Sequence, residues 1–298
     1  MWDAEFISPF HFGGAGRGID EMAAAQEQKP PMFSTTRVEG TDNVYVFRYQ
    51  NSQAMFVVTP EGVIATDPIG LARPQAVTTY IEEIKKVTPA PIRYVIYSHQ
   101  HFDHIAGGKP FKDLGATFVS HARAKNWLVK LNHPDVVIPD EVVSDKGRTL
   151  TLGGTTLELH YLGRNHSDNS LVMRLPKEKI IFTVDWVPLG AMPGVGMIDS
   201  YPLEYENSLK KLLAMDWERM IPGHPGQPGA RLGTKKDVQD LITFMQEASA
   251  EVKQAAEAGE CWADAEKEVT LAKYANWPGY QNRRFVIQRY CALWGRGF

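Results

Sequence analysis

Short runs of β-branched and aromatic residues alternate with turn residues in the first third of the chain. The runs occupy residues 44–47, 54–58 and 63–66, and a Pro-Glu-Gly turn at 60–62 separates the last two. Valine, isoleucine, tyrosine and phenylalanine favour extended backbone, whereas proline and glycine favour turns. The pattern therefore predicts three consecutive antiparallel strands.

Helical and extended spacing alternate farther along the chain. Apolar residues recur at the helical period over 74–86, and the apolar run at 91–98 is typical of a buried strand. A strand, helix, strand order indicates the α/β class. Gly153 and Gly154 predict a hairpin turn. We expect further strands over 116–120, 148–152, 155–162, 170–175 and 179–184, and helices over 122–131 and 204–214.

The two ends of the chain differ from its middle. Residues 1–35 are rich in glycine, proline and alanine and show no sustained period, which predicts an irregular N-terminal arm. Beyond the Pro-Gly cluster at 225–229, helical spacing covers 235–258 and 282–295. We therefore expect an arm over 1–35, a catalytic domain over 36–230, and a helical extension over 231–298 that packs on the same domain.

Composition limits the classes of function. Hydrophobic residues make up 43% of the chain and charged residues 22%, which is ordinary for a globular protein with a large core. The formal net charge of −3 offers no basic excess for nucleic acid or for acidic membranes. Cys261 and Cys291 are too few for a disulfide framework or a thiolate zinc site. We expect a small-molecule substrate, with neither nucleic acid nor a membrane as partner.

No stretch of the sequence approaches the roughly 20 apolar residues of a membrane helix. The first six residues contain acidic side chains and do not resemble a secretory signal. These observations predict a cytoplasmic protein, or a periplasmic or secreted one if a signal has been removed. The apolar residues at 290–294, in the last helical segment, favour a homodimer.

Four side chains of the kind that bind metals cluster directly after the expected strand at 91–98. They are His99, His101, Asp103 and His104, and three of the nine histidines of the chain are among them. Imidazole and carboxylate are common zinc ligands. Alternate residues of an extended turn point the same way, so His99 and His101 can share one metal while Asp103 and His104 face another. A solvated cluster without metal is the alternative, but buried imidazoles and carboxylates would then each need a partner.

Three later residues fit the same scheme. His166, Asp185 and His224 each follow an apolar run. Ligands that come from strand ends onto one rim of a rigid scaffold can hold a pair of metals. A single histidine after a strand is more often structural. The three later residues are therefore predicted as metal ligands only in combination with the first cluster.

The ordered series resembles the metallo-β-lactamase superfamily, whose H-x-H-x-D-H motif is followed by separate His, Asp and His positions. The likeness spans about 43–226 and implies an α/β fold, a four-layer αββα sandwich with the metal site at one edge of two packed sheets. It also implies that Asp67, at the end of an early strand, orients the metal ligands without binding a metal itself. The alternative is that Asp67 only forms a turn. The implied ligands are His99, His101 and His166 for the first metal, Asp103, His104 and His224 for the second, and Asp185 as the bridge.

The resemblance implies two zinc ions, or other divalent metals such as manganese, iron or cobalt. Two cations about 3.5–4 Å apart lower the pKa of a shared water from 15.7 towards about 7 and stabilise a developing oxyanion. Asp103 is a candidate to accept and return a proton. Asn169 and Tyr201 are candidates for holding a carbonyl oxygen.

The aspartate at 185 bears on the substrate. Superfamily members specialised for β-lactams usually carry cysteine or a non-bridging residue there, so the chain looks more like lactonases and glyoxalase II. The apolar loop after Asp185 is predicted to wall a substrate pocket through Trp186, Met192 and Met197, with packing inside the loop as the alternative.

We expect hydrolysis of a small, fairly apolar ester-like substrate, with a lactone favoured. β-Lactam, thioester or aryl-halide hydrolysis would use the same chemistry and stays open. A diiron oxidoreductase is the alternative from another class, but such proteins need a flavin partner domain, and the sequence shows no second nucleotide-binding unit.

Overall fold

The computed structural model describes residues 31–225, 231–262 and 264–298. Their strands form two sheets, of seven and five strands. The larger sheet contains, in spatial order, β1 (Phe33–Arg37), β2 (Val44–Tyr49), β3 (Ser52–Thr59), β4 (Gly62–Thr66), β5 (Ile92–Ile96), β6 (Thr117–His121) and β7 (Glu141–Val143). The smaller sheet contains β12 (Arg219–Pro222), β11 (Ile180–Thr183), β10 (Leu171–Leu175), β9 (Thr155–Tyr161) and β8 (Arg148–Leu152).

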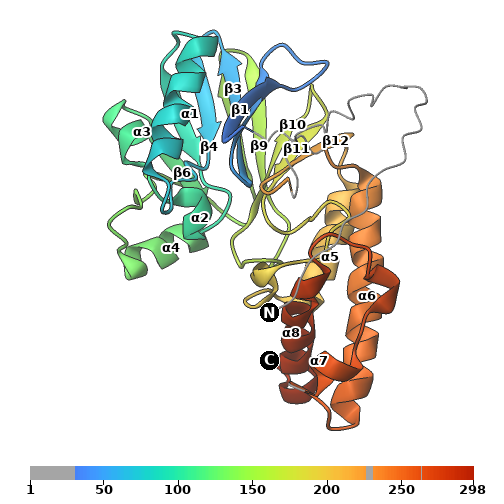
Figure 1. The fold of residues 1–298 in the computed structure, drawn as a ribbon. Helices are drawn as coiled ribbons and strands as arrows, with labels where there is room; N and C mark the ends of the chain where they lie inside the picture. Colours follow the sequence, from blue (N-terminus) through green and yellow to red (C-terminus); the bar gives the residue numbers. More distant parts are fainter. Residues whose placement is uncertain (1–30, 226–230, 263) are drawn as a thin grey trace, which may run out of the picture. The chain divides into compact units, whose positions relative to one another are not determined.

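Each sheet changes direction once across its width. Strands β1 to β4 are antiparallel, as the sequence predicted for the three at 44–66, and β4 to β7 are parallel. In the smaller sheet β8 to β11 are antiparallel, and β11 and β12 are parallel. The parallel strands β4, β5 and β6 are joined through helices, which gives the predicted α/β arrangement (Figure 1).

The two sheets pack face to face around one buried cluster. Met55 and Ile64 of the larger sheet share this cluster with Leu159, Met173 and Phe182 of the smaller one, and all five are fully buried. Each such side chain contributes about 1.5–3 kcal/mol through the area it removes from water. This cluster is the middle of the four-layer sandwich.

Helices cover the outer faces of both sheets and bury a second and a third cluster. Residues of α1 such as Tyr80 pack on the larger sheet, whereas residues of α5, α6 and α8 pack on Val172, Ile181 and Met220 of the smaller one. The αββα class predicted from the resemblance is thereby confirmed. The helices are α1 (Pro74–Val87), α2 (Phe102–Ile105), α3 (Lys109–Asp113), α4 (Ala122–Leu131), α5 (Pro202–Ala214), α6 (Lys235–Glu257), α7 (Ala265–Glu268) and α8 (Arg283–Arg296), with short 3-10 turns η1 (Val195–Met197), η2 (Ala272–Tyr274) and η3 (Tyr280–Asn282).

Local sequence explains where the main helices begin. Pro74 and Pro202 occupy the first turns of α1 and α5, where a missing N–H costs nothing. Thr234 and Asp237 form a reciprocal capping box at the start of α6. The sequence did not predict β1, β7, β12 or the shortest helices, α2, α3 and α7.

The two predicted domain boundaries, near residues 35 and 230, can be compared with the structure. The N-terminal arm of 1–35 lies mostly outside the described residues, and its last residues belong to β1, which pairs with β2. The boundary near 230 falls in the segment 226–230, which is also outside the described residues. Helices α6 and α8 lie against each other and join the cluster on the smaller sheet.

The apolar face of the last helix is used within the chain. Val286, Ile287, Tyr290 and Cys291 of α8 are buried in the cluster shared with α6, and Trp294 is 38% exposed. The homodimer, which rested on these residues, therefore stays a prediction. Within the described ranges, none of the helices has both the length and the apolar character that crossing a bilayer requires.

Candidate metal centre

The predicted ligands meet at one rim of the sandwich. His99 and His101 follow β5, Asp185 follows β11, and His224 follows β12, each by two to five residues. Helix α2 carries Asp103 and His104, and the loop between β9 and β10 carries His166. Strand ends are rigid supports, so side chains far apart in sequence are brought together without long flexible loops.

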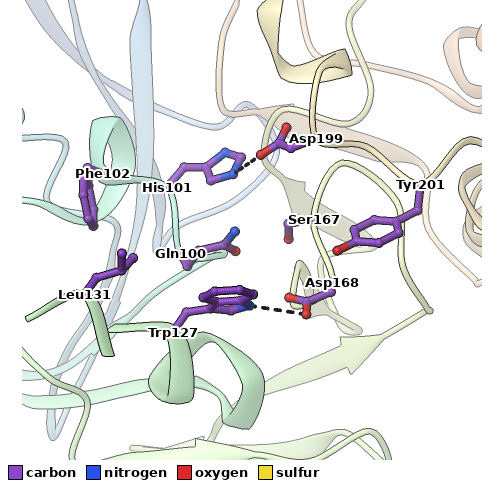
Figure 2. A pocket seen from close by; sticks show the side chains of 9 residues that line it. All are labelled: Gln100, His101, Phe102, Trp127, Leu131, Ser167, Asp168, Asp199 and Tyr201. Atoms are coloured by element: carbon purple, nitrogen blue, oxygen red, sulfur yellow. Dashed lines mark hydrogen bonds and ion pairs between the residues drawn. The ribbon is translucent and has the colours of Figure 1, made fainter. Parts of the chain in front are cut away.

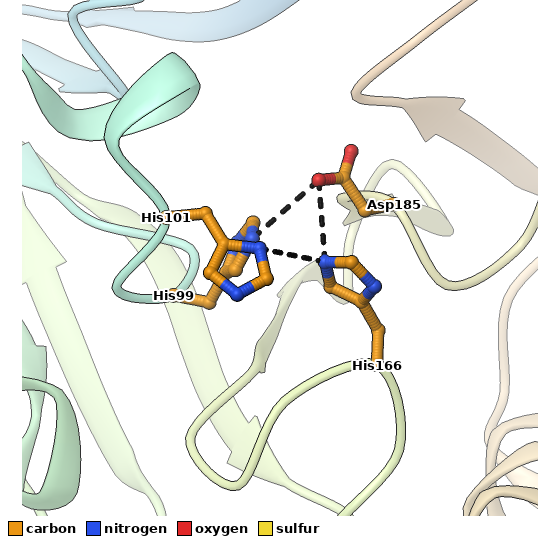
Figure 3. Close-up of side chains that lie close together, drawn as sticks. All are labelled: His99, His101, His166 and Asp185. Atoms are coloured by element: carbon orange, nitrogen blue, oxygen red, sulfur yellow. Dashed lines mark hydrogen bonds and ion pairs between the residues drawn. The ribbon is translucent and has the colours of Figure 1, made fainter. Parts of the chain in front are cut away.

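One ligand group contains His99, His101, His166 and Asp185, whose ligand atoms all lie within 4.8 Å of one another (Figure 3). Asp185 Oδ2 is 3.5 Å from His99 Nε2 and 3.4 Å from His166 Nε2. His166 Nε2 is 2.9 Å from His101 Nδ1. These residues form the A group, and they are the set that the resemblance assigned to the first metal together with the bridge.

A second group contains Asp103, His104, Asp185 and His224, again within 4.8 Å. His104 Nε2 is 3.1 Å from Asp185 Oδ2 and 3.3 Å from Asp103 Oδ2. His224 Nε2 is 3.1 Å from Asp185 Oδ1. These residues form the B group, which matches the set assigned to the second metal.

Asp185 belongs to both groups because its carboxylate lies between them. Oδ2 lies near His99 and His166 of the A group and near His104 of the B group, whereas Oδ1 lies near His224. Its backbone has φ of +72°, a left-handed conformation that is uncommon for a residue other than glycine. Such strained backbone is often found at functional sites. The conformation presents the carboxylate between the two groups.

The opposite ring nitrogen of most of these histidines already has a partner. His99 Nδ1 lies 2.9 Å from Ser98 Oγ, His166 Nδ1 donates to the Gly196 carbonyl at 3.0 Å, and His224 Nδ1 donates to the Asn51 carbonyl at 2.6 Å. A partner on one ring nitrogen fixes the orientation of the ring and turns the other nitrogen towards the centre, where a bound cation would take the place of a proton. The rings are therefore oriented before any ion binds.

His101 is oriented through an aspartate that the sequence did not single out. His101 Nε2 lies 2.9 Å from Asp199 Oδ2, which leaves Nδ1 facing the A group. Asp199 follows η1 and lies in an apolar loop, 98 positions away from His101. A lone aspartate in a loop has no pattern that marks it, so only the folded chain reveals this contact.

Asp67 lies behind His104, where the resemblance implied it. Its carboxylate is fully buried, Oδ1 accepts a hydrogen bond from Ser98 N at 2.8 Å, and Oδ2 lies 3.9 Å from His104 Nδ1. Burial raises the pKa of Asp67 to about 6, although the nearby His104 opposes the rise. The position fits an orienting role, which stays a prediction.

The chemistry of the donor set fits divalent cations. Burial lowers the pKa of His99 to about 3, so this imidazole is neutral as a metal ligand must be. Burial alone would raise the pKa of Asp185, but the charges of His104 and His224 hold it well below its ordinary value. Among the described residues His99 Nε2 is buried without a hydrogen bond, although it points into the A group. Cations placed in the two groups would satisfy these donors.

A pocket of about 440 Å³ opens beside the A group (Figure 2). Tyr201 lines it with its hydroxyl pointing inward, and its role in holding a carbonyl oxygen stays a prediction. Asn169 does not line the pocket: it is fully buried and donates through Nδ2 to Asp168 Oδ1 at 2.6 Å. The full lining comprises Gln100, His101, Phe102, Trp127, Leu131, Ser167, Asp168, Asp199 and Tyr201.

The predicted pocket wall of Trp186, Met192 and Met197 differs from the observed one. All three are at most 4% exposed and lie in the cluster formed with α5, α6 and α8. The Tyr205 hydroxyl donates to the Trp186 carbonyl at 2.6 Å, which draws the loop towards α5. These residues belong to the core because the C-terminal helices cover them. Their closeness to Asp185 in sequence had suggested a place beside the metal site instead.

Helix α4 supplies the wall instead. Trp127 and Leu131 lie one turn apart on this helix and face the pocket, although they remain 43% and 54% exposed. Exposed large apolar side chains mark a binding surface, but their exposure is visible only in the folded chain. Both residues are far in sequence from the histidine cluster, so the sequence did not indicate that they line the pocket.

Comparison with known proteins supports the same assignment. The model of the metallo-beta-lactamase superfamily matches residues 54–224, which is more than half of the chain and includes every residue of both ligand groups. The chain belongs to the metallo-beta-lactamase superfamily. The superfamily match covers strands from both sheets, so it concerns the sandwich as well as the site.

Individual relatives are distant. The alpha subunit of 2,4-dinitroanisole O-demethylase from Nocardioides sp. is 22% identical over 65% of this chain and 58% of its own length. A type 2 metallo-beta-lactamase from Elizabethkingia meningoseptica is 27% identical over 47% of this chain and 57% of its own length. The match thus spans less than two thirds of either relative. The crystal structure of DIM-1 metallo-beta-lactamase shares the fold, with a TM-score of 0.63 at 19% identity over 74% of this chain and all of that one.

Proposed function

We propose that the protein is a metal-dependent hydrolase that acts on a small, fairly apolar ester-like substrate, with a lactone as the favoured case. The observation that carries the proposal is the shared Asp185, which joins two ligand groups beside a pocket of small-molecule size. Two bound divalent cations, zinc above all, supply a water of lowered pKa and polarise a carbonyl. His99, His101 and His166 would hold one cation, Asp103, His104 and His224 the other, and Asp185 both.

The chain's own residues provide the remaining steps. The Asp103 side chain is 38% exposed and adjoins both His104 and His224, so it can accept a proton from water and return it to the leaving group. Partial burial alone would raise the pKa of Asp103, but hydrogen bonds from these two histidines hold it below its usual range, so the side chain is a carboxylate at neutral pH. The Tyr201 hydroxyl points into the pocket, which supports a role for it in orienting an ester oxygen.

Activated aromatic substrates form a second candidate class. The name of one relative describes the removal of a methyl group from an aryl ether, 2,4-dinitroanisole. The rings of Phe102, Trp127 and Tyr201 line the pocket here and fit a planar group. Hydrolysis of aryl ethers or halides therefore belongs beside β-lactams and thioesters in any test.

A substrate panel tests the proposal. Lactones, aryl esters, thioesters, β-lactams, activated aryl ethers and activated aryl halides are assayed with wild type, Asp185→Ala, His101→Ala and the control His160→Ala. His160 lies on β9, binds Glu158 at 3.0 Å and belongs to neither ligand group. We expect hydrolysis by wild type and His160→Ala, with the two ligand variants at least about 100-fold slower. Full activity in both ligand variants would refute the mechanism, and bound iron without hydrolytic turnover would favour the diiron alternative.

A further inference from the structure

The pocket beside the A group combines aromatic walls with negative charge. Phe102, Trp127 and Tyr201 contribute rings, and Asp168 and Asp199 contribute carboxylates (Figure 2). Within the described parts of the chain, no lysine or arginine is among the residues that line the pocket. Carboxylates next to the faces and edges of aromatic rings form an environment that attracts cations and repels anions.

The charge of Asp168 is left largely uncompensated by its direct contacts. Its Oδ2 accepts from Trp127 Nε1 at 3.4 Å, and its Oδ1 accepts from Asn169 Nδ2 at 2.6 Å. Both donors are neutral, so they fix the carboxylate in place without cancelling its charge. The carboxylate of Asp199 is 51% exposed and contacts only one ring nitrogen, that of His101.

The guanidinium groups nearest the pocket are engaged elsewhere. Arg123 Nη2 pairs with Asp145 at 2.6 Å, and Arg123 Nη1 donates only to the backbone carbonyl of Asp168. Arg164 pairs with Glu204 and lies over the Tyr201 ring at 4.7 Å. Arg289 donates to the carbonyl oxygens of Ser200 and Phe298. None of these three is among the lining residues, so the pocket wall outside the proposed ion sites carries the two carboxylates.

We propose that this pocket selects a planar aromatic group that is neutral or positively charged and discriminates against anionic groups. The choice of ester-like reaction rests on the proposed function, whereas the charge preference rests on the pocket alone. Substrates that place a carboxylate in the pocket, such as penicillins or glutathione thioesters, bind poorly. Neutral lactones, aryl esters and esters that carry a quaternary ammonium group bind well.

A binding experiment on the zinc-loaded protein tests the preference without any turnover. The probes are phenyltrimethylammonium and benzenesulfonate, which carry the same ring and opposite charges, and the readout is calorimetric Kd. We expect phenyltrimethylammonium to bind at least about 10-fold more tightly at low salt, which corresponds to 1.4 kcal/mol, and the ratio to shrink at high salt. Equal binding, or tighter binding of benzenesulfonate, overturns the proposal.

Two variants locate the effect. Asp168→Asn keeps the shape and removes the charge, so we expect the ratio of the two Kd values to fall about 5-fold or more. Asp216→Asn removes a carboxylate that pairs with Arg174 and Lys179, and we expect the wild-type ratio. A ratio unchanged by Asp168→Asn overturns the proposal. If Asp168→Asn does not fold, the ratio of the two Kd values in the wild type, and the dependence of that ratio on salt, still test the proposal.

Hydrolysis separates this proposal from the proposed function. Aryl acetates with a para trimethylammonium or a para sulfonate group are compared by kcat/KM. Ammonium binding with the expected ratio but no hydrolysis of any ester refutes the proposed function and supports the pocket inference. Hydrolysis of both esters at equal kcat/KM, together with equal Kd values, refutes the pocket inference and supports the hydrolase.

Discussion

The A group and the B group share Asp185 but differ in how closely the protein encloses them. In the A group the side chains of His99 and His166 are at most 3% exposed and that of His101 is 23% exposed. In the B group the side chains of Asp103 and His224 are 38% and 33% exposed. Ligands held by burial and by fixed partners lose less freedom when an ion binds. The A group should therefore hold its ion more tightly, and the B group should release its ion first.

Removal of His99 should abolish the A group. His99→Ala deletes a fully buried ring that binds Ser98 on one side and faces Asp185 on the other. We expect kcat/KM to fall about 10³-fold, because polarisation by an ion is worth several kcal/mol. Steady-state kinetics on the best substrate of the panel measures the loss. Retention of most activity by His99→Ala would show that the A group is dispensable.

Removal of His224 should affect only the more open B group. We expect His224→Ala to lose the second ion while keeping the first, with kcat/KM reduced about 10²-fold. Metal analysis after desalting provides the measurement beside the kinetics. An equal loss of both ions from His224→Ala would contradict the difference in enclosure between the two groups.

A methyl group at position 196 should disturb the A group without removing a ligand. An added Cβ would lie 2.4 Å from His166 Cε1, closer than real side chains approach. We expect Gly196→Ala to weaken ion binding and lower kcat/KM about 30-fold by displacing the ring. Gly194→Ala, in the same loop, meets only Asn282 Nδ2 at 3.9 Å and should behave as wild type. Identical behaviour of both variants would argue against a fixed His166.

The weakest effect should come from Asp199. Asp199→Asn keeps the size of the side chain but removes the carboxylate that contacts His101 Nε2. Since this side chain is half exposed, we expect affinity for the first ion to fall about 10-fold, at the lower end for such a partner. Competition with a zinc-binding dye measures that affinity. Unchanged affinity for the first ion would mean that Asp199 does not contribute to the orientation of His101.

The sequence marked the first four ligand candidates because they lie close together, whereas the division of all seven residues into two sets was implied by the resemblance. His99, His101, Asp103 and His104 lie within six residues, and Asp185 and His224 each stand directly beyond a strand. Individual strands could be predicted for the same reason, since β3 and β9 have clear patterns of their own, whereas the four-layer sandwich was implied by the resemblance to a superfamily. Both the four-residue cluster and the strand patterns depend on residues close together in the chain.

The pocket could not be predicted because its walls depend on tertiary packing. Trp127 reaches the pocket from α4, whereas Trp186, although it follows Asp185 directly, is covered by helices that begin after residue 201. Asp199 meets His101 only once the loop before α5 has folded over the A group. No local pattern distinguishes a tryptophan of the core from one of a binding surface.

The central claim is that Asp185 joins two ion sites of unequal affinity. Native mass spectrometry of the zinc-loaded protein, followed through stepwise addition of a chelator, tests it most directly. The structure predicts two zinc ions per wild-type chain, loss of one before the other, one ion in His224→Ala, and one or none in Asp185→Ala. A single ion in the wild type, or two ions retained in Asp185→Ala, would contradict it.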